Sequence, residues 1–263
     1  MSSSKSEQLT RDGRAKMDPV FLRDGAELVY TLQENVTQLS LMRLKLADGV
    51  SERLHPSATV SEVEAAFTPD GKFYTFLQIR KQLVIRDTNK NKDAQLASVG
   101  LRRPSIAPDG SRVIFSMPAA NGLQIQSVNN EGQDRRSLTQ RGFNSWPAFS
   151  PDGKLIAFGL SLDGNYDIYV MNADGSNRRR LTDSPGLDMR PAWSPDGRHL
   201  AFTSNRDGNY QIYVMKTDGS DLRRVTKHPE RDDFPTWHPD GKRLAIVSER
   251  SGKFDICLAE VPL

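Results

Sequence analysis

The sequence predicts an all-β protein, a six-bladed β-propeller of four-stranded antiparallel blades whose ring is closed by the N-terminal strand pairing with the last blade. Three observations lead there. A unit of about 44 residues repeats along the chain, each unit holds several tight turns, and the last unit is one strand short. Turn residues interrupt the chain every six to twelve residues, which is too often for helices.

The repeat is marked by Asp-Gly pairs that follow an apolar cluster, spaced between 39 and 46 residues apart. Pro precedes the Asp in five of the six pairs, and Pro-Asp-Gly is a tight-turn sequence because Pro restricts φ and Gly accepts a positive φ. The turn aspartates are Asp24, Asp70, Asp109, Asp152, Asp196 and Asp240.

Residues 191–226 show how one repeat unit is expected to form a blade. A short strand at 191–194 precedes the Asp196 turn, and a second strand follows at 200–204. An Asp-Gly turn at Asp207 leads to a third strand at 211–216, and a further turn leads to a fourth at 221–226. Four strands joined by hairpin turns are one antiparallel propeller blade.

Two apolar positions recur in every unit, three residues before and six residues after the turn Asp. A single blade cannot bury both of its faces, so we expect these side chains to form the packing between neighbouring blades. The first set is Phe21, Phe67, Ile106, Phe149, Trp193 and Trp237, and the second is Tyr30, Phe76, Phe115, Phe158, Phe202 and Ile246.

The last unit begins at Asp240 and has room for only three strands before Leu263. In the regular units a Leu-Thr-like pair ends the outermost strand, 15 residues before the next turn Asp, and Leu9 stands 15 residues before Asp24. We therefore expect residues of about 4–10 to supply the outermost strand of the last blade, which leaves no exposed edge there. Residues 1–263 then form a single domain, with blades starting near 17, 63, 102, 145, 189 and 233.

Composition excludes several classes. The net charge of +3, from 36 basic and 33 acidic residues, argues against nucleic acid as the partner. No stretch approaches the roughly 18 apolar residues of a membrane span. Cys257 is the only cysteine, so the chain cannot form an intrachain disulfide. We expect Cys257 to be a packing residue. We expect a monomer without a cofactor.

The repeat resembles that of the TolB propeller and its relatives, the PD40 type. Residues 149–182 and 193–226 carry the pattern almost throughout, 237–257 carry it to the chain end, and 17–98 carry it weakly. The second unit lacks both the Asp-Gly hairpin and the Leu-Thr end. The resemblance implies a protein-binding platform of the bacterial envelope, although similar units also occur in tricorn-like proteases and prolyl-oligopeptidase relatives.

TolB also carries an N-terminal α/β domain that is absent from this sequence. No apolar signal-peptide core follows Met1, so the chain as it stands is expected in the cytoplasm. A periplasmic location would require that a precursor segment was removed.

Catalytic motifs do not emerge. The segment starting at Gly159 lacks the final Gly of a serine-hydrolase elbow, and the four histidines are scattered without metal-ligand spacing. The Asp163 and Asp207 turns are too short for a calcium loop. The sequence therefore assigns no catalytic or metal residue. A propeller enzyme can gather its groups from several blades, so a carbohydrate lyase or hydrolase, or a propeller serving a separate peptidase chain, stays open as the alternative.

The most informative residues are those that do not repeat. Five of six units begin the inner strand with Pro, but the residue before it changes from unit to unit. These positions are expected on one face around the channel, together with the Asp163, Asp207 and Arg250 hairpins. Mixed carboxylates, arginines and aromatics favour a non-enzymatic surface that binds a protein or peptide. Its predicted residues are Asp18, Glu64, Arg102, Arg103, Trp146, Met189, Arg190, Asp233 and Phe234.

Overall fold

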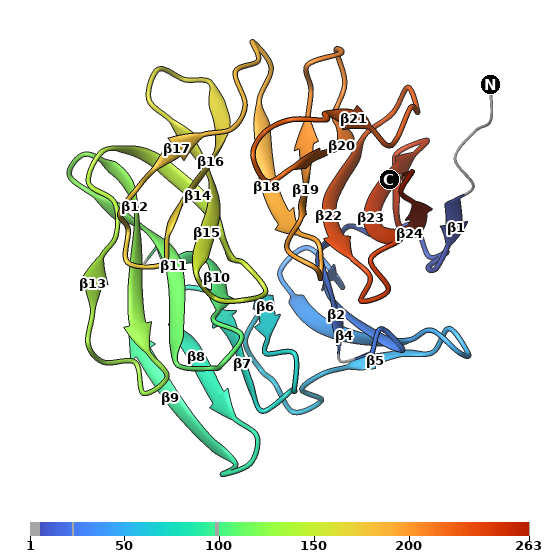
Figure 1. Ribbon diagram of the computed structural model, residues 1–263. Helices are drawn as coiled ribbons and strands as arrows, with labels where there is room; N and C mark the ends of the chain where they lie inside the picture. Colours follow the sequence, from blue (N-terminus) through green and yellow to red (C-terminus); the bar gives the residue numbers. More distant parts are fainter. Residues whose placement is uncertain (1–5, 23, 98–99, 263) are drawn as a thin grey trace.

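The computed structural model describes residues 6–22, 24–97 and 100–262, which form sheets arranged around a central channel (Figure 1). Within these ranges every regular element is a β-strand. No helix of the described residues is long and apolar enough to cross a membrane.

The described strands fall into five sheets. One contains β2 (Lys16–Leu22), β3 (Glu27–Gln33), β4 (Leu39–Lys45) and β5 (Ser51–Arg53), and the next contains β6 (Glu62–Phe67), β7 (Phe73–Gln78), β8 (Gln82–Asp87) and β9 (Lys92–Ala97). The third contains β10 (Arg102–Ile106), β11 (Arg112–Ala119), β12 (Gly122–Asn129), β13 (Arg136–Ser137), β14 (Gly142–Phe149), β15 (Leu155–Ser161), β16 (Tyr166–Asn172) and β17 (Arg179–Arg180). The fourth contains β18 (Asp188–Trp193), β19 (His199–Ser204), β20 (Gln211–Lys216) and β21 (Arg223–Arg224), and the fifth contains β22 (Asp232–Trp237), β23 (Arg243–Arg250), β24 (Lys253–Glu260) and β1 (Ser6–Gln8).

Each repeat unit contributes one inner strand to the channel wall, and these strands contact one another in a closed ring. β2 contacts β6, β6 contacts β10, β10 contacts β14, and the series continues through β18 and β22 back to β2. The first and last units are thus neighbours, which Figure 1 shows as blue strands beside red ones.

The expectation of six separate four-stranded antiparallel blades is wrong. Only four sheets have four strands, and the remaining eight strands form one continuous sheet because β12 and β14 pair in parallel. Gly122 and Gly142 permit this contact: a Cβ on Gly122 would collide with the carbonyl oxygen of Gly142. The backbone of the β11–β12 hairpin and the first residue of β14 therefore approach more closely than side chains would allow.

The hydrophobic core is divided among the contacts between neighbouring repeat units. Phe115 packs with β6–β8 residues, Phe158 with Ile114 and Ile125, and Ile246 with Val214. The cluster around Tyr30 also includes Ile256 and Leu258 from β24, so it joins the first unit to the last. The apolar positions that recur in the sequence therefore hold the units together around the ring.

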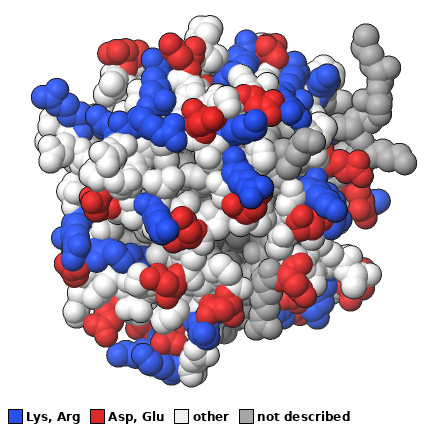
Figure 2. Space-filling model, viewed as in Figure 1, with Lys and Arg blue, Asp and Glu red and all other residues white. Residues whose placement is uncertain are grey.

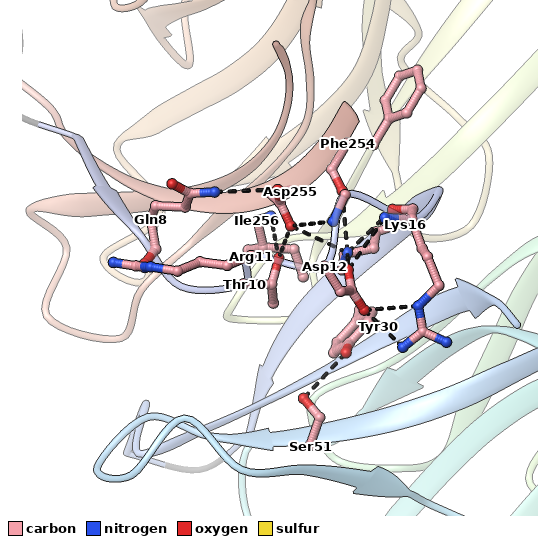
Figure 3. A network of polar contacts seen from close by, with 12 residues as sticks. Gln8, Thr10, Arg11, Asp12, Lys16, Tyr30, Ser51, Phe254, Asp255 and Ile256 are labelled. Carbon is pink, nitrogen blue, oxygen red and sulfur yellow. Dashed lines mark hydrogen bonds and ion pairs between the residues drawn. The ribbon is translucent and has the colours of Figure 1, made fainter. Parts of the chain in front are cut away.

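The ring closes where β1 pairs antiparallel with β24, the pairing that the sequence predicts for residues 6–8 (residues 4 and 5 of the expected strand lie outside the described residues). Thr10 extends the contact. Its Oγ1 donates to Asp255 Oδ1 at 2.8 Å, and the Ile256 backbone N–H donates to Thr10 Oγ1 at 2.9 Å (Figure 3).

Lys16 lies beneath this closure with a fully buried side chain. Its ammonium group contacts the carboxylates of Asp12 and Asp255 and donates to the carbonyl oxygens of Arg14 and Phe254 at 3.1 Å each (Figure 3). A buried ammonium is tolerated when its charge and its donors are both matched, and here both ends of the chain supply the partners.

Candidate functional site at the channel mouth

Every inner strand is interrupted by a β-bulge, and each bulge places one non-glycine residue in the left-handed backbone region. The φ angles lie between 51° and 57°. These residues are Asp18, Glu64, Arg103, Trp146, Arg190 and Phe234. They are the six positions at which the sequence stops repeating, and we call them the bulge residues.

The six bulge residues converge on a central cavity of about 210 Å³ at the mouth of the channel. The prolines that follow five of them also line it, with Ala65 at the remaining position. Pro cannot donate to a strand ladder and is confined to bulges and edges within sheets, so its recurrence here follows from the bulge. The local sequence thus turns one side chain per unit toward the channel axis.

Arg103 joins two carboxylates across the cavity. Its guanidinium pairs with Asp18, and its Nε lies 3.3 Å from Oε1 of Glu64. The backbone N–H of Arg103 also donates to Oε2 of Glu64 at 2.5 Å. Three repeat units are therefore connected by charge at the floor of the channel mouth.

Burial dominates the electrostatics of these groups. It raises the pKa of the Asp18 carboxyl, although Arg103 and Arg190 act in the opposite direction. Burial also raises the pKa of Glu64, again against the effect of Arg103. The pKa of the Arg190 guanidinium is lowered, first by burial. The cavity is thus a desolvated site in which charges interact strongly.

Arg190 is held between two aromatic rings. Its guanidinium carbon lies 4.3 Å from the centroid of Phe234 and 5.2 Å from that of Trp146. Its Nη1 lies 3.3 Å from Asp233, and neither Nη1 nor Nε, both buried, makes a hydrogen bond to a residue that the structure describes. Arg190 is therefore a stacked, pre-positioned side chain whose guanidinium is held by two rings and one carboxylate.

Asp233 and Met189, two of the predicted binding residues, do not line the cavity. Asp233 is 1% exposed and Met189 is 7% exposed. Asp233 instead accepts a hydrogen bond from Thr203 Oγ1 at 2.7 Å and pairs with Arg231 and Arg190. Asp233 thus holds the Arg190 guanidinium through a buried ion pair.

Trp146 owes its place to a glycine on the next strand. A Cβ on Gly159 would lie 2.9 Å from Cε3 of Trp146, so the indole rests where a side chain is missing. Tyr166 packs edge-on against the same indole, with ring centroids 5.0 Å apart. Gly159 resembles part of a hydrolase motif in the sequence. In the structure it makes room for the Trp146 indole.

A larger hollow of about 740 Å³ opens beside the cavity and shares Glu64, Arg103 and Trp146 with it. We call it the lateral groove. Its further lining residues include Ile79, Arg80, Arg102, Leu123, Phe143 and Tyr166. Arg102 is the one predicted residue that lies in the groove and not in the central cavity.

Sequence reasoning missed Ile79, Arg80, Phe143 and Tyr166. Ile79 and Arg80 form the β7–β8 hairpin, which lies on the same face as the hairpins at Asp163, Asp207 and Arg250. The signal was present, because the second unit departs from the repeat at this hairpin by lacking Asp-Gly. A hairpin that departs from the repeat on this face therefore indicates a candidate site, just as a non-repeating residue on an inner strand does.

Comparison with known proteins concerns the fold. Residues 138–262 match the family model described as the TolB beta propeller domain. A protein assigned as TolB from Agrobacterium tumefaciens superposes with a TM-score of 0.75 at 20% identity, covering 97% of this chain and 93% of that one. The fold is TolB-like.

Other TolB-like and enzymatic propellers are similar. TolB from Acinetobacter baumannii has a TM-score of 0.72 at 19% identity; the match covers 90% of this chain but only 64% of that one. A gluconolactonase from Xanthomonas campestris has a TM-score of 0.73 at 17% identity, covering 98% and 90%. No curated protein matches in sequence.

The TolB-like match divides the site. Trp146, Arg190 and Phe234 lie inside the matched residues, whereas Arg80 and Arg102 precede them. One part of the groove thus lies inside the matched residues, and Arg80 and Arg102 lie outside them.

Among the described residues there is no group of three or more His, Cys, Asp or Glu side chains arranged to hold a metal ion.

Proposed function

We propose that the channel-mouth face binds a segment of a protein or peptide, with the bulge residues as its floor. The observation that carries the proposal is the occupation of six left-handed positions by residues with side chains. Each such position costs about 1 kcal/mol or more, and glycine would avoid that cost. Side chains kept at this cost and aimed at one cavity support a binding role.

The chemistry of the floor supports the same proposal. Arginine and aromatic residues dominate the strongest contacts of protein interfaces, and Arg190 with Trp146 and Phe234 forms such a cluster. The Arg190 side chain is 16% exposed and lines the cavity, so the charge of its guanidinium would favour oxygen acceptors of a ligand, such as backbone carbonyls. Because the cluster is already stacked, little side-chain freedom would be lost on binding.

An enzymatic function is the second candidate, and one observation favours it. Asp18 and Glu64 are carboxyls with raised pKa values facing a cavity, which is a common property of general acids. The similar gluconolactonase fold shows that such a propeller can carry an enzyme. Both groups also form structural ion pairs with Arg103, so the observation weighs less than the shape of the floor.

The test compares three immobilised proteins: the wild type, a triple variant with Trp146, Arg190 and Phe234 changed to Ala, and a control with Lys154, Arg198 and Lys242 changed to Ala. The control residues lie on the turns at the opposite ends of the inner strands. Proteins captured from a lysate of the source cells are quantified by mass spectrometry, and thermal melting shows whether each variant folds. We expect the floor variant to lose the partner and the control to keep it. Equal capture by all three would overturn the proposal.

A further inference from the structure

We propose that the lateral groove selects an acidic segment that also carries an aromatic or aliphatic side chain, with Arg80 and Arg102 pairing with its carboxylates. The inference rests on the proposed function, because it names the chemistry of the segment that the channel-mouth face would bind. It concerns residues that neither the family match nor the repeat pattern assigns.

The balance of charge in the groove favours an acidic ligand. Its charged lining residues are Glu64, Arg80, Arg102 and Arg103, and Glu64 is already paired with Arg103. The side chains of Arg80 and Arg102 are exposed, and neither forms a hydrogen bond or ion pair with any described residue. Two unpaired guanidinium groups thus face one hollow, where carboxylates are the matching partners.

Arginines of two other hairpins on the same face are occupied. Arg206 pairs with Asp188 at 2.7 Å, and Arg250 pairs with Asp232 at 3.0 Å. Figure 2 shows the wider pattern on its viewed face, where basic and acidic side chains are interspersed. Arg80 and Arg102 therefore differ from the arginines of these two hairpins, whose charge is already matched by a carboxylate.

The backbone of Arg80 gives a second, independent observation. Its φ is 57°, in the left-handed region; the corresponding hairpins of the fourth and fifth units have Gly164 and Gly208 at positive φ, and that of the sixth unit has the small residue Ser251 at 53°. A side chain at such a position costs about 1–2 kcal/mol relative to glycine. Arg80 thus brings a long side chain to a turn where these other units have glycine or serine, and it lines the groove.

The apolar part of the groove is unusually exposed. Phe143 is 55% exposed and Ile79 is 39% exposed, although both are large hydrophobic residues. They line the same hollow as Leu123 and Tyr166, and its volume of about 740 Å³ lies in the range of ligand-binding pockets. An apolar side chain of the ligand would cover them, which explains why the segment needs both charge and an apolar anchor.

The first experiment is selection of random twelve-residue peptides displayed on phage against the folded full chain. Parallel selections use R80E/R102E, the floor variant with Trp146, Arg190 and Phe234 changed to Ala, and a control, K154E/R198E, whose side chains are 81% and 82% exposed. We expect peptides enriched in Asp and Glu beside an aromatic or aliphatic residue on the wild type and the control. We expect R80E/R102E to lose this preference or to invert it toward basic peptides.

The outcomes separate the two proposals. Peptides that need the floor residues but are neutral or basic, and that are unaffected by R80E/R102E, would overturn the acidic selection and leave the proposed function standing. Failure to enrich any peptide on the wild type over the floor variant would overturn the proposed function. Enrichment of acidic peptides that is lost in R80E/R102E supports both.

The second experiment measures affinity with one selected peptide, labelled with fluorescein, by anisotropy. R80Q and R102Q should each weaken binding about tenfold, because each removes a charge-assisted contact, and R80K should keep part of the affinity. Binding should also weaken as salt is raised. Displacement of the peptide by a twelve-nucleotide oligothymidine at a lower concentration than by the unlabelled peptide would overturn the inference in favour of a nucleic acid.

Discussion

Thr10 and Asp255 join the two ends of the chain through a hydrogen bond of 2.8 Å between side chains 245 residues apart. The same kind of contact occurs inside single units, where Thr139 donates to Gln124 at 2.9 Å and the Ile125 N–H donates to Thr139. Thr10 therefore makes the same pair of hydrogen bonds in the last unit that Thr139 makes inside its own unit. Closure uses the ordinary contacts of the repeat, supplied from the other end of the chain.

Removal of residues 1–10 should therefore destabilise the whole ring. The change exposes the edge of β24, removes the Thr10 contacts and weakens the surroundings of the buried Lys16. We expect a lower melting temperature and aggregation, measured by thermal unfolding and light scattering. Removal of residues 1–5 alone is the matched control, because β1 and Thr10 remain. A shortened chain that melts like the full one would show that the closure contributes little.

Gly122→Ala should destabilise the protein by more than an ordinary glycine replacement. Its φ of 111° is unfavourable for alanine, and the new Cβ would collide with the Gly142 carbonyl. We expect about 1–2 kcal/mol from backbone strain and about 1–3 kcal/mol more from the collision. Gly208→Ala is the control, since its φ is also positive but no atom lies within 4 Å. Urea unfolding of both variants measures the difference, and equal losses would contradict the collision.

Glu64→Gln should change how stability depends on pH. Burial raises the pKa of Glu64, so its carboxyl holds a proton more tightly in the folded chain than in the unfolded chain. Stability from this group is present below the unfolded pKa of about 4.3 and is lost as the pH rises through the folded value. The stability of Glu64→Gln relative to the wild type should therefore increase upward from about pH 4.3.

Thermal melting across that range checks the sign. Glu52→Gln is a matched control, because a hydrogen bond from Arg43 lowers the pKa of Glu52. Its contribution is present above the unfolded pKa and is lost as the pH falls, so its slope should be opposite. Slopes of the same sign in both variants would contradict the burial of Glu64.

Arg80→Gly should separate stability from binding. Glycine relieves the left-handed strain, so the free energy of unfolding should stay constant or rise by about 1 kcal/mol, while affinity for a selected acidic peptide falls. Arg102→Ala is the control, because Arg102 has no such strain and should lose affinity without a gain in stability. A clear loss of stability in Arg80→Gly would show that the Arg80 side chain stabilises the hairpin.

The sequence predicted what depends on local chemistry. The Pro-Asp-Gly turns and the recurring apolar positions both follow from residues near one another in the chain. The non-repeating residues before each Pro were recognised for the same reason. The bulge that turns them toward the axis explains why they are free to differ.

Three features of the structure were not predicted. The merged sheet arises from a close approach of Gly122 and Gly142, which no local pattern encodes. Met189 and Asp233 were misplaced because adjacent strand residues point to opposite sides, so only one of each pair can face the channel. The groove was missed because Ile79 and Arg80 belong to the unit in which the repeat is weakest.

The pairing of β1 with β24 also has a consequence for how the chain reaches its native state. Residues of β1 find their partners in β24, as in the contact of Gln8 with Asp255 across 247 residues. Contacts between such distant segments form slowly, because a long loop must close before any contact compensates for it. While the chain is growing on the ribosome, the segment around Thr10 must wait unpaired, and a chain halted before β24 cannot complete the ring.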